Sequence, residues 1–417
     1  MKKEKDIIVI GGGIIGLSVA YYLSRQGRSV TLIEKKDEVG VGSSYGNAGW
    51  IANGFSIPMA APGIPLQGMK WLFDPTSPFY IKPRLDFDLF RWLWKFIGAC
   101  NEKDLRASYA ILLSLGQGSF DLFDEIFSQE DVDFGYESKG RLSLFTSKKS
   151  FEKSMADVAF VREYGVDVSL LDVDGVREIE PNISASVKHG FYSKDYAHLD
   201  PGRFTQEMAR LAESRGVEIM KGVSVRGFEI TAGQISSVET TQGTFIPDQV
   251  VLAAGAWSAL LARKLKIKLP IQPAKGYSLT YKCPPELLPQ LPISLVERKA
   301  AATPMGERVR FASTLELAGF DSTINQPRVD AIRRSAKEYL SGTEALAEEE
   351  VWSGFRAATP DDLPIIGRSD KYENLIFATG HGTLGMTYSL ITGKLVSQII
   401  AGEEASIDLK PLRAERF

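Results

Sequence analysis

The clearest pattern of hydrophobic and polar positions lies in the first 35 residues. Residues 6–10 form a short apolar run with β-branched side chains, which is typical of a buried parallel strand. A glycine-rich stretch follows, and apolar positions then recur with helical spacing over residues 14–26. Gly27 suits the position after a helix C-terminus, and a second apolar run over residues 29–33 ends at Glu34. The pattern therefore predicts a strand, a helix and a second, parallel strand in succession.

Similar patterns return in the second half of the chain. Residues 204–214 have the pattern of a helix with Asp200 as its N-cap, and residues 216–225 read as a strand that leads into a meander. Residues 249–255 form an apolar run that ends in glycine. Near the C-terminus, residues 374–400 read as a strand, a glycine-rich turn and a helix. Two glycine-marked turns, far apart in sequence, thus each precede a predicted helix.

A third hydrophobic region, residues 69–97, is rich in large aromatic side chains. Leu89, Leu93 and Phe96 can share one face of a helix, and two basic residues add positive charge. The favoured interpretation is a helix that packs on another domain or forms a subunit contact. The alternative is a peripheral membrane helix that brings the protein to a membrane quinone.

Composition and charge exclude several classes of protein. The 417 residues include 49 Lys and Arg against 52 Asp and Glu, a net charge of −3, so no basic excess indicates a nucleic-acid partner. Cys100 and Cys283 match no metal-binding or redox spacing, and no metal site is expected. No apolar run is long enough for a spanning helix or a signal peptide. We expect a cytoplasmic protein, with peripheral association at the inner face of the cell membrane as the alternative.

The first glycine turn has the spacing of a dinucleotide-binding site. Gly11 permits a tight bend, Gly13 lets the backbone approach a pyrophosphate, and Gly16 lets the helix pack on the strand. Glu34 stands where such units place the acid that accepts hydrogen bonds from a ribose. Both NAD and FAD use this unit. The second glycine turn favours a flavin, because the far end of that cofactor needs donors of its own.

Six segments carry a resemblance to a known family. They read GGGIIGLSVAYYL, SSYGNAGWIANGFSIPMAAPG, VVLAAGAWS, PAKGYSLT, GFRAATPDDLPIIG and NLIFATGHGTLGMT. Together with Glu34 they resemble the D-amino-acid dehydrogenases, within the broader glycine oxidase and D-amino-acid oxidase superfamily, over about residues 6–400. The resemblance implies FAD as cofactor and a D-amino acid as substrate. The substrate is oxidised to an imino acid, which water converts to a 2-oxo acid and ammonia.

The resemblance also implies a cofactor site assembled from segments that are distant in sequence. The pyrophosphate would be held by Gly11, Gly13, Ile14 and Gly16, and phosphate or ribityl oxygens would be bound by Ser43 and Ser44. The adenosine ribose would lie at Glu34 and Lys35, and the adenine would meet the backbone of Val225. The isoalloxazine ring would lie along Asn47, Ala48 and Gly49, its O2 and N1 edge would face N–H groups of Gly382, Thr383, Leu384 and Gly385, and a strand beside the cofactor would end at Ala254 and Gly255.

In this superfamily no acid or base is needed at the reacting carbon, and hydride passes from the substrate α carbon to flavin N5. The protein contributes positioning. Arg356 is expected to bind the substrate carboxylate, for which Arg is better suited than Lys; the alternative is a surface arginine paired with Asp361 or Asp362. Tyr277 is expected to close the pocket, with a core tyrosine as the alternative. His381 is expected to act on the cofactor side.

One segment departs from the family pattern. Relatives often carry a substrate-facing aromatic where this chain reads ERKAAAT, residues 297–303. The preferred amino acid is therefore open, and a D-proline or D-hydroxyproline substrate is an alternative. Lys275 is a weaker candidate for a contact with the flavin's pyrimidine edge.

The electron acceptor and the oligomeric state are also open. A dehydrogenase would pass its electrons to a quinone or another acceptor, whereas a D-amino-acid or glycine oxidase would use O₂. Alternatives of other classes are a flavin-bearing subunit of a hetero-oligomeric electron-transfer complex and a nucleotide-binding module without redox chemistry.

We predict an α/β fold with a Rossmann-like FAD-binding domain and an interleaved α+β substrate domain that contains an antiparallel sheet. The FAD-binding domain is expected to comprise residues 1–85, 150–265 and 345–417. The substrate domain is expected to comprise residues 86–149 and 266–344. Both domains would be discontinuous in sequence.

Overall fold

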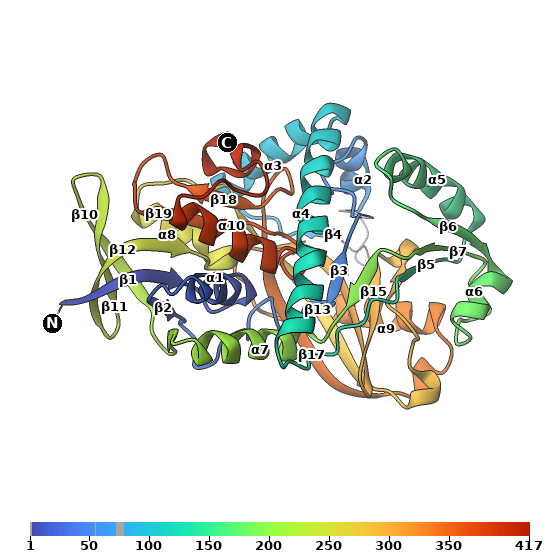
Figure 1. Ribbon diagram of the computed structural model, residues 1–417. Helices are drawn as coiled ribbons and strands as arrows, with labels where there is room; N and C mark the ends of the chain where they lie inside the picture. Colours follow the sequence, from blue (N-terminus) through green and yellow to red (C-terminus); the bar gives the residue numbers. More distant parts are fainter. Residues whose placement is uncertain (1, 55, 72–78) are drawn as a thin grey trace.

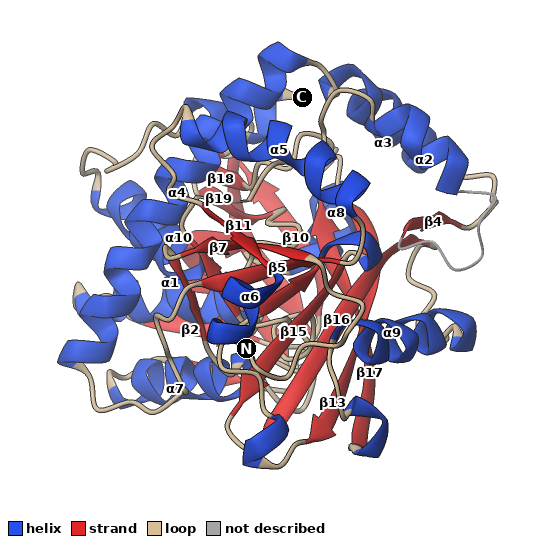
Figure 2. Cartoon of the chain, turned by 90° about the vertical axis from the view of Figure 1, so that its right-hand side faces the viewer, coloured by secondary structure: helices blue, strands red, loops and turns tan. Residues whose placement is uncertain are grey.

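The computed structural model describes residues 2–54, 56–71 and 79–417. Two large sheets stand at opposite ends of the molecule, and the long helix α4 (Glu102–Gln129) runs between them (Figure 1). Helices are ranged around the outside of the strands (Figure 2). The mixed α/β fold with an antiparallel second sheet agrees with the prediction from sequence.

The first sheet contains the predicted strand–helix–strand unit. β1 (Lys2–Ile10) pairs in parallel with β2 (Val30–Ile33) on one side and with β12 (Gly243–Leu252) on the other. β9 (Glu218–Met220) and β19 (Leu375–Thr379) extend the parallel part, and β10 (Val225–Thr231), β11 (Gln234–Thr240) and β18 (Ile365–Arg368) add antiparallel strands. Residues 7–10 are buried on both faces, which is why the sequence reads there as an unbroken apolar run.

Helices α1 (Ile14–Arg25), α7 (Pro201–Ser214) and α10 (Ser389–Ala401) contribute to one hydrophobic core with α4 and the first sheet. α1 and α10 approach closely at Gly393, where a Cβ atom would lie 2.6 Å from the carbonyl oxygen of Ser18. The Asp200 carboxylate accepts hydrogen bonds from the N–H groups of Gly202 and Arg203, which confirms the predicted N-cap of α7. α8 (Ser258–Lys264) packs in a second core, next to β12.

The second sheet is mainly antiparallel. Its order is β17 (Ala347–Ala358), β13 (Gln272–Lys282), β16 (Arg308–Leu317), β15 (Ala300–Met305), β14 (Ile293–Leu295), β5 (Arg141–Phe145), β7 (His189–Ser193) and β6 (Ser169–Asp172), with β4 (Phe79–Ile81) beside β16. One face packs against α9 (Gln326–Tyr339) and α6 (Val173–Ile179). We call the opposite face, which meets the loop at residues 43–49, the roof.

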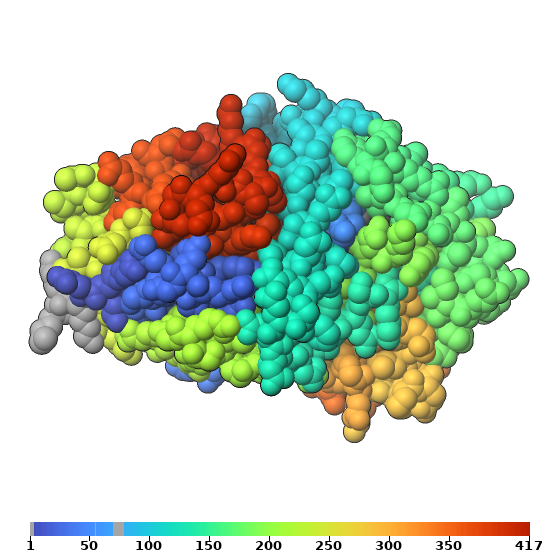
Figure 3. Space-filling view, viewed as in Figure 1, coloured from blue at the N-terminus to red at the C-terminus, as the bar shows by residue number. Residues whose placement is uncertain are grey.

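Smaller elements join the two sheets. β3 (Trp50–Ala52) pairs with β8 (Tyr196–His198), so the chain that follows residues 43–49 is hydrogen-bonded to the chain that precedes α7. α2 (Ile64–Trp71), α3 (Phe87–Ala99) and α5 (Lys148–Arg162) complete the helices of the described residues. α4 lies at the surface between the C-terminal part and the second sheet (Figure 3). In the described part of the chain, no helix is both long and apolar enough to cross a bilayer.

The strand pairings differ from the expected domain assignment in three places. β4, the pair β6 and β7, and β17 all lie in ranges assigned to the FAD-binding domain, yet they hydrogen-bond within the second sheet. The expected limits followed changes in local pattern, whereas strand pairing joins residues that are distant in sequence. The remaining limits stay a prediction.

Candidate functional site

The first glycine turn is packed too tightly for side chains at two of its three motif positions. Gly11 has a φ of +117°, and a Cβ atom there would lie 2.5 Å from the carbonyl oxygen of Ala253. A Cβ atom on Gly16 would lie 1.9 Å from the carbonyl oxygen of Gly11, so this glycine lets α1 close on β1. At Gly13, the nearest atom to an added Cβ is Oγ of Ser44, at 3.4 Å. The middle glycine therefore faces a more open space, as an approaching phosphate requires.

Glu34 lies at the end of β2, next to the glycine turn. Its Oε2 accepts a hydrogen bond of 2.7 Å from the N–H of Gly12, and its Oε1 accepts one from Lys36. Lys35 is exposed and places its Nζ 3.5 Å from the centre of the Trp257 ring. The carboxyl ends of β1, β2 and β12 thus bring Gly11, Glu34, Ala254 and Gly255 to one edge of the sheet, where ligands bind in this architecture. Val225, at the start of β10, pairs with Thr240 in an adjoining antiparallel strand.

The segment of residues 43–49 is tied to the start of α1. The N–H of Ile14 donates a 3.0 Å hydrogen bond to Oγ of Ser44, which is buried, whereas Ser43 is half-buried. Oδ1 of Asn47 accepts from the N–H of Gly49, which closes a small turn. Gly49 has a φ of +73°, and a Cβ atom there would meet the carbonyl oxygen of Leu199 at 2.1 Å. Gly49 is thus required by the packing of this segment, apart from any cofactor.

The second glycine turn extends from residue 380 to 388, and α10 begins only at Ser389. The predicted order of strand, glycine-rich turn and helix is confirmed. The N–H of Gly382 donates to the carbonyl oxygen of Ala357, so this donor of the expected set is already engaged. The N–H of Leu384 donates to the carbonyl oxygen of His381. The N–H groups of Thr383 and Gly385 make no hydrogen bond to any described residue, and they remain as donors for a ligand.

Thr387 joins the second glycine turn to β3, the strand that follows the loop at residues 43–49. Its Oγ1 donates to the carbonyl oxygen of Trp50 at 3.0 Å and accepts from the N–H of Ala52 at 3.3 Å. Residues 50–52 and Thr387 are therefore neighbours, although more than 330 positions separate them. This is the arrangement that the resemblance requires for one ring held from two sides.

His381 faces the interior of the first domain. Its Nε2 lies 2.9 Å from Oγ1 of Thr392 in α10, and burial lowers the pKa of the ring to about 3. The histidine is therefore neutral at physiological pH. Its role on the cofactor side stays a prediction, and its observed contact fixes the turn against α10.

Arg356 lies on the roof. Its guanidinium crosses Gly276 of the neighbouring strand, where an added Cβ atom would lie 2.1 Å from Nη1. Nη1 donates a 2.7 Å hydrogen bond to the carbonyl oxygen of Thr314. Thr314, with a φ of +73°, sits in an irregularity of β16 that turns this carbonyl toward the arginine. Burial lowers the pKa of Arg356 to about 10, so the guanidinium remains charged near neutral pH.

The alternative of a surface arginine paired with Asp361 or Asp362 does not describe Arg356. Asp361 is bound by Arg416, at 2.7 and 3.0 Å, and Asp362 accepts from the N–H of Ala60. Among the described residues, no carboxylate forms an ion pair with Arg356. A half-buried positive charge without a protein counter-charge is suited to an anionic ligand.

Tyr277 and Lys275 lie on the opposite face of β13 from Arg356. Side chains alternate along a strand, and Gly276 is the residue on the roof. The Tyr277 hydroxyl donates to Glu316 at 3.0 Å, and Lys275 Nζ lies 3.3 Å from the same carboxylate. Both side chains are buried behind the sheet. This placement supports the alternative that Tyr277 is a core residue. It contradicts the suggested contact between Lys275 and the flavin, because the Lys275 side chain lies behind the sheet.

Two further arginines on the roof have no marker in the sequence. Arg310 on β16 is aligned with Thr303 on β15, and Arg141 on β5 projects from the same face. The guanidinium of Arg141 lies 4.1 Å from the centre of the Tyr196 ring and 5.1 Å from that of Trp50. The Trp50 indole donates to Oγ1 of Thr303 at 2.8 Å. Trp50 and Tyr196 thus place aromatic rings beside the roof, although residues 297–303 contain no aromatic side chain. A comparison of residues 297–303 with the same strand in relatives does not reveal these rings.

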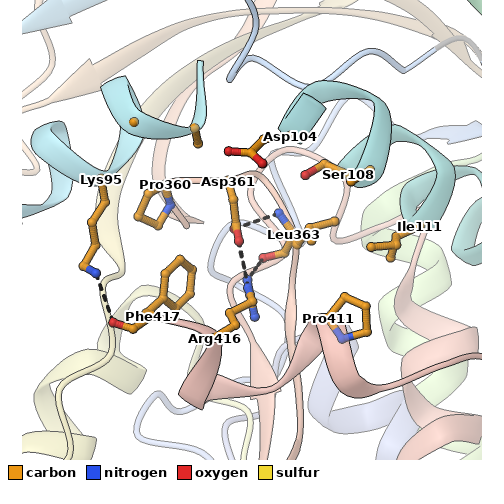
Figure 4. Close-up of a pocket in the computed structure, with 13 residues that line it drawn as sticks. Lys95, Asp104, Ser108, Ile111, Pro360, Asp361, Leu363, Pro411, Arg416 and Phe417 are labelled. Carbon is orange, nitrogen blue, oxygen red and sulfur yellow. Dashed lines mark hydrogen bonds and ion pairs between the residues drawn. The ribbon is translucent and has the colours of Figure 1, made fainter. Parts of the chain in front are cut away.

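A separate cavity of about 530 Å³ lies between α3, α4 and the C-terminal residues (Figure 4). Pro360, Asp361 and Leu363 line it, and the Asp361–Arg416 ion pair lies in its wall. None of the expected cofactor or substrate residues lines this cavity. It is therefore distinct from the site between the glycine turns and the roof.

Comparison with known proteins agrees with this arrangement. Residues 6–399 match the family described as FAD dependent oxidoreductase. The chain belongs to this family. It is 34% identical over 417 residues to the D-amino acid dehydrogenase of Granulibacter bethesdensis, with 99% of each chain covered. It is 35% identical to the protein of that name from Methylobacterium nodulans, again with 99% of each covered. The glycine oxidase structure from Geobacillus kaustophilus has the same fold, with a TM-score of 0.80, 23% identity and 100% of both chains covered.

The residues of the site fit FAD, the cofactor of this family. The space at Gly13 and the N-terminus of α1 suit a pyrophosphate. In the second turn the N–H of Gly382 is already hydrogen-bonded, but the N–H groups of Thr383 and Gly385 are available as donors to the opposite end of the cofactor. Thr387 links this second turn to the strand that follows the loop at residues 43–49.

Proposed function

We propose that this protein catalyses the oxidative deamination of D-amino acids to 2-oxo acids and ammonia, and passes the electrons to a quinone or a similar acceptor. The observation that carries the proposal is the charged Arg356 on the roof, which has no carboxylate partner among the described residues. The family match supplies the flavin, and the curated relatives supply the substrate class.

The chain's own residues act on the substrate by binding and orientation. Arg356 binds the α-carboxylate and thereby fixes the α carbon below the roof. FAD, when bound, supplies a two-electron acceptor for the hydride that leaves this carbon. The amino nitrogen then shares its lone pair with the carbon, and water hydrolyses the imino acid. No protonated histidine is required, in keeping with the neutral, buried His381.

An anaerobic titration tests the proposal. The holoenzyme is mixed with a panel of D- and L-amino acids, including D-proline and D-hydroxyproline, and loss of the yellow flavin absorbance is followed. We expect reduction by D-amino acids. Reduction by L- but not D-amino acids would overturn the stereochemical assignment, and no flavin absorbance at all would overturn the enzyme assignment. Repetition in air with measurement of peroxide distinguishes an oxidase from a dehydrogenase.

The membrane part of the proposal rests on the outer face of α3. Phe87, Phe90, Trp94 and Ile97 are 87%, 54%, 79% and 54% exposed, and they recur at helical spacing. The inner face packs on the roof sheet through Leu89 and Trp92. One face of this helix packs on the sheet, as the favoured interpretation expects, and the other face is exposed. The portion of this region at residues 72–78 lies outside the described residues.

We propose that this exposed face contacts the inner surface of the cell membrane, where a quinone acceptor resides. Aromatic side chains are suited to the membrane interface. Co-sedimentation with anionic liposomes should be lost in the triple variant Phe87→Ser, Phe90→Ser, Trp94→Ser. It should persist in Ile230→Ser, which removes an exposed apolar side chain on β10. Equal sedimentation of the triple variant and the parent would reject the assignment.

A further inference from the structure

Arg310 holds the backbone of residues 45–47 by hydrogen bonds, and we call this contact the clamp. It is only 2% exposed, and three hydrogen bonds fix the direction of its guanidinium. Nε donates to Oγ1 of Thr280 on the adjacent strand at 3.1 Å. Nη1 donates to the carbonyl oxygens of Tyr45 and Asn47, at 2.6 and 3.2 Å. The arginine therefore holds the backbone of residues 45–47 against the roof.

These contacts determine where the next two N–H groups point. In a trans peptide, the carbonyl of one residue and the N–H of the next have opposite directions. The carbonyls of Tyr45 and Asn47 point toward Arg310, so the N–H groups of Gly46 and Ala48 point away from it. Neither N–H makes a hydrogen bond to a described residue. Gly46 is buried and Ala48 is half-buried. A backbone N–H that is removed from water normally has a partner, so the Gly46 donor indicates a ligand, and the Ala48 donor is free to bind the same ligand.

The packing of the neighbouring residues leaves this segment little freedom. Gly46 lies against the ring of Trp352, where an added Cβ atom would approach to 1.9 Å. The Tyr45 ring lies 5.4 Å from the guanidinium of Arg310. Gly49 is fixed by its own turn, as described above. The carbonyl oxygens of Tyr45 and Asn47 thus both accept hydrogen bonds from one charged side chain, that of Arg310.

We propose that Arg310 is a positioning residue for the flavin. By binding the carbonyls of Tyr45 and Asn47, it holds the N–H groups of Gly46 and Ala48 toward the isoalloxazine ring as hydrogen-bond donors. These donors, with the buried positive charge behind them, favour the electron-rich reduced ring over the oxidised one. The inference rests on the flavin cofactor of the proposed function, but it does not depend on the identity of the substrate.

Arg310→Met tests the proposal, with Arg310→Lys as the conservative variant. FAD release on dilution of the holoenzyme is followed by flavin fluorescence. The reduction equilibrium of the bound flavin is measured against a reference dye. For Arg310→Met we expect FAD affinity to fall at least roughly tenfold. The equilibrium should shift roughly tenfold against the reduced form, or about 30 mV for a two-electron couple. Arg310→Lys should recover part of both effects, because an ammonium group can donate to a carbonyl.

The matched control is Arg308→Gln, two residues along the same strand. Arg308 binds Asp200 at 2.8 Å and is more exposed than Arg310, so its loss removes a nearby charge but leaves the clamp intact. This control should keep both the affinity and the equilibrium within twofold of the parent. If Arg310→Met matches the parent in both measurements, the proposal is wrong. An equal change in Arg308→Gln would also overturn it, since the effect would then be one of general charge.

A second variant covers the case in which Arg310→Met does not fold. Thr280→Val removes the acceptor for Nε of Arg310 without altering the flavin-facing segment. We expect smaller shifts in the same direction, and an unchanged dye equilibrium in this variant would then reject the proposal. Both readouts need no amino acid. A failure of D-amino-acid oxidation can therefore be told apart from a failure of the Arg310 assignment.

Discussion

At the scale of single residues, the site uses few charges and places each with backbone contacts. Arg310 donates hydrogen bonds to two carbonyl oxygens of the flavin-facing segment. Arg356 donates to one carbonyl oxygen, and its other N–H groups remain available to a ligand. The two arginines lie on the same sheet face, but their partners give them different tasks. The direction of each guanidinium, and not its mere presence, separates a structural clamp from a ligand-binding group.

Substitution of Arg356 should separate cofactor binding from substrate reduction. Arg356→Leu removes the carboxylate-binding group while leaving both glycine turns intact, so we expect the protein to keep its flavin absorbance. The expected loss is about 2–5 kcal/mol of substrate interaction, or roughly 30- to 4000-fold in kcat/KM. Stopped-flow flavin reduction provides the measurement. Arg263→Leu, which removes an exposed arginine that binds Asp88, is the control and should react like the parent.

Asp362 should make stability depend on pH. Burial raises the pKa of this carboxyl to about 6 from 3.8, so the folded state binds more protons than the unfolded state between these values. Stability contributed by the protonated form is complete below pH 4 and is lost as the pH rises through 6. The loss amounts to about 2–3 kcal/mol. Asp362→Asn keeps an acceptor for the N–H of Ala60 and tolerates the φ of +60°, and it should abolish this dependence.

Urea unfolding of the holoenzyme at pH 4.5 and pH 7 measures this effect. The stability difference between Asp362→Asn and the parent should grow toward pH 7. Asp37→Asn, at an exposed position, should show no such trend. A parallel pH profile for Asp362→Asn and the parent would mean that the carboxyl titrates normally in the folded state.

At the scale of elements, the sequence predicts what is local and misses what depends on strand pairing. The first strand, helix and second strand were predicted because periodicity and the glycine spacing are properties of adjacent residues. The face of Tyr277 was not predictable in the same way. β13 is buried on both faces, so its sequence carries no alternation that would tell inside from outside.

The same limit explains Arg310 and the second glycine turn. Arg310 becomes part of the site only because β16 brings it opposite residues 45–47, more than 260 positions away. No spacing rule covers such a contact. The glycine-rich turn after β19 was predicted, but the N–H of Gly382, which was expected to face the flavin, instead donates to the carbonyl oxygen of Ala357 on a neighbouring segment. Tertiary contacts decided both outcomes.

Two glycines of one motif should respond differently to substitution. In Gly16→Ala the new methyl group would lie 1.9 Å from a backbone oxygen, so α1 must move away from β1. We expect a loss of at least about 1–3 kcal/mol in the free energy of unfolding. In Gly13→Ala the nearest atom is a hydroxyl at 3.4 Å, so the fold should be nearly unaffected. FAD affinity should nevertheless fall by roughly tenfold or more, because the methyl group meets the pyrophosphate.

Thermal unfolding of the FAD-depleted proteins and FAD titration measure the two effects separately. The free energy of unfolding should change mainly in Gly16→Ala, and the affinity of the folded protein should change in Gly13→Ala. If Gly13→Ala binds FAD like the parent, the glycine turn does not hold the pyrophosphate.

At the scale of the whole molecule, the site lies where two sheets with different connectivity meet. The first sheet supplies the glycine turns and Glu34, and the second supplies the roof with Arg356 and Arg310. The chain crosses between the sheets several times, and α4 runs along the boundary (Figure 1). A cofactor at this boundary contacts segments that are distant in sequence, and it should therefore stabilise the whole molecule.

Removal of FAD should accordingly loosen the segment of residues 43–50 and the second glycine turn together. A ligand that binds only the folded state stabilises it by about 2.7 kcal/mol at a free concentration of 100 times Kd. The FAD-depleted protein should therefore melt a few degrees below the holoenzyme. Hydrogen exchange should rise at residues 43–50 and 380–388, whose backbones are linked through Thr387. α9 lies behind the second sheet and should keep its protection. Faster exchange in only one of these two segments would contradict a cofactor held from both sides, because the loss of a shared ligand must release both.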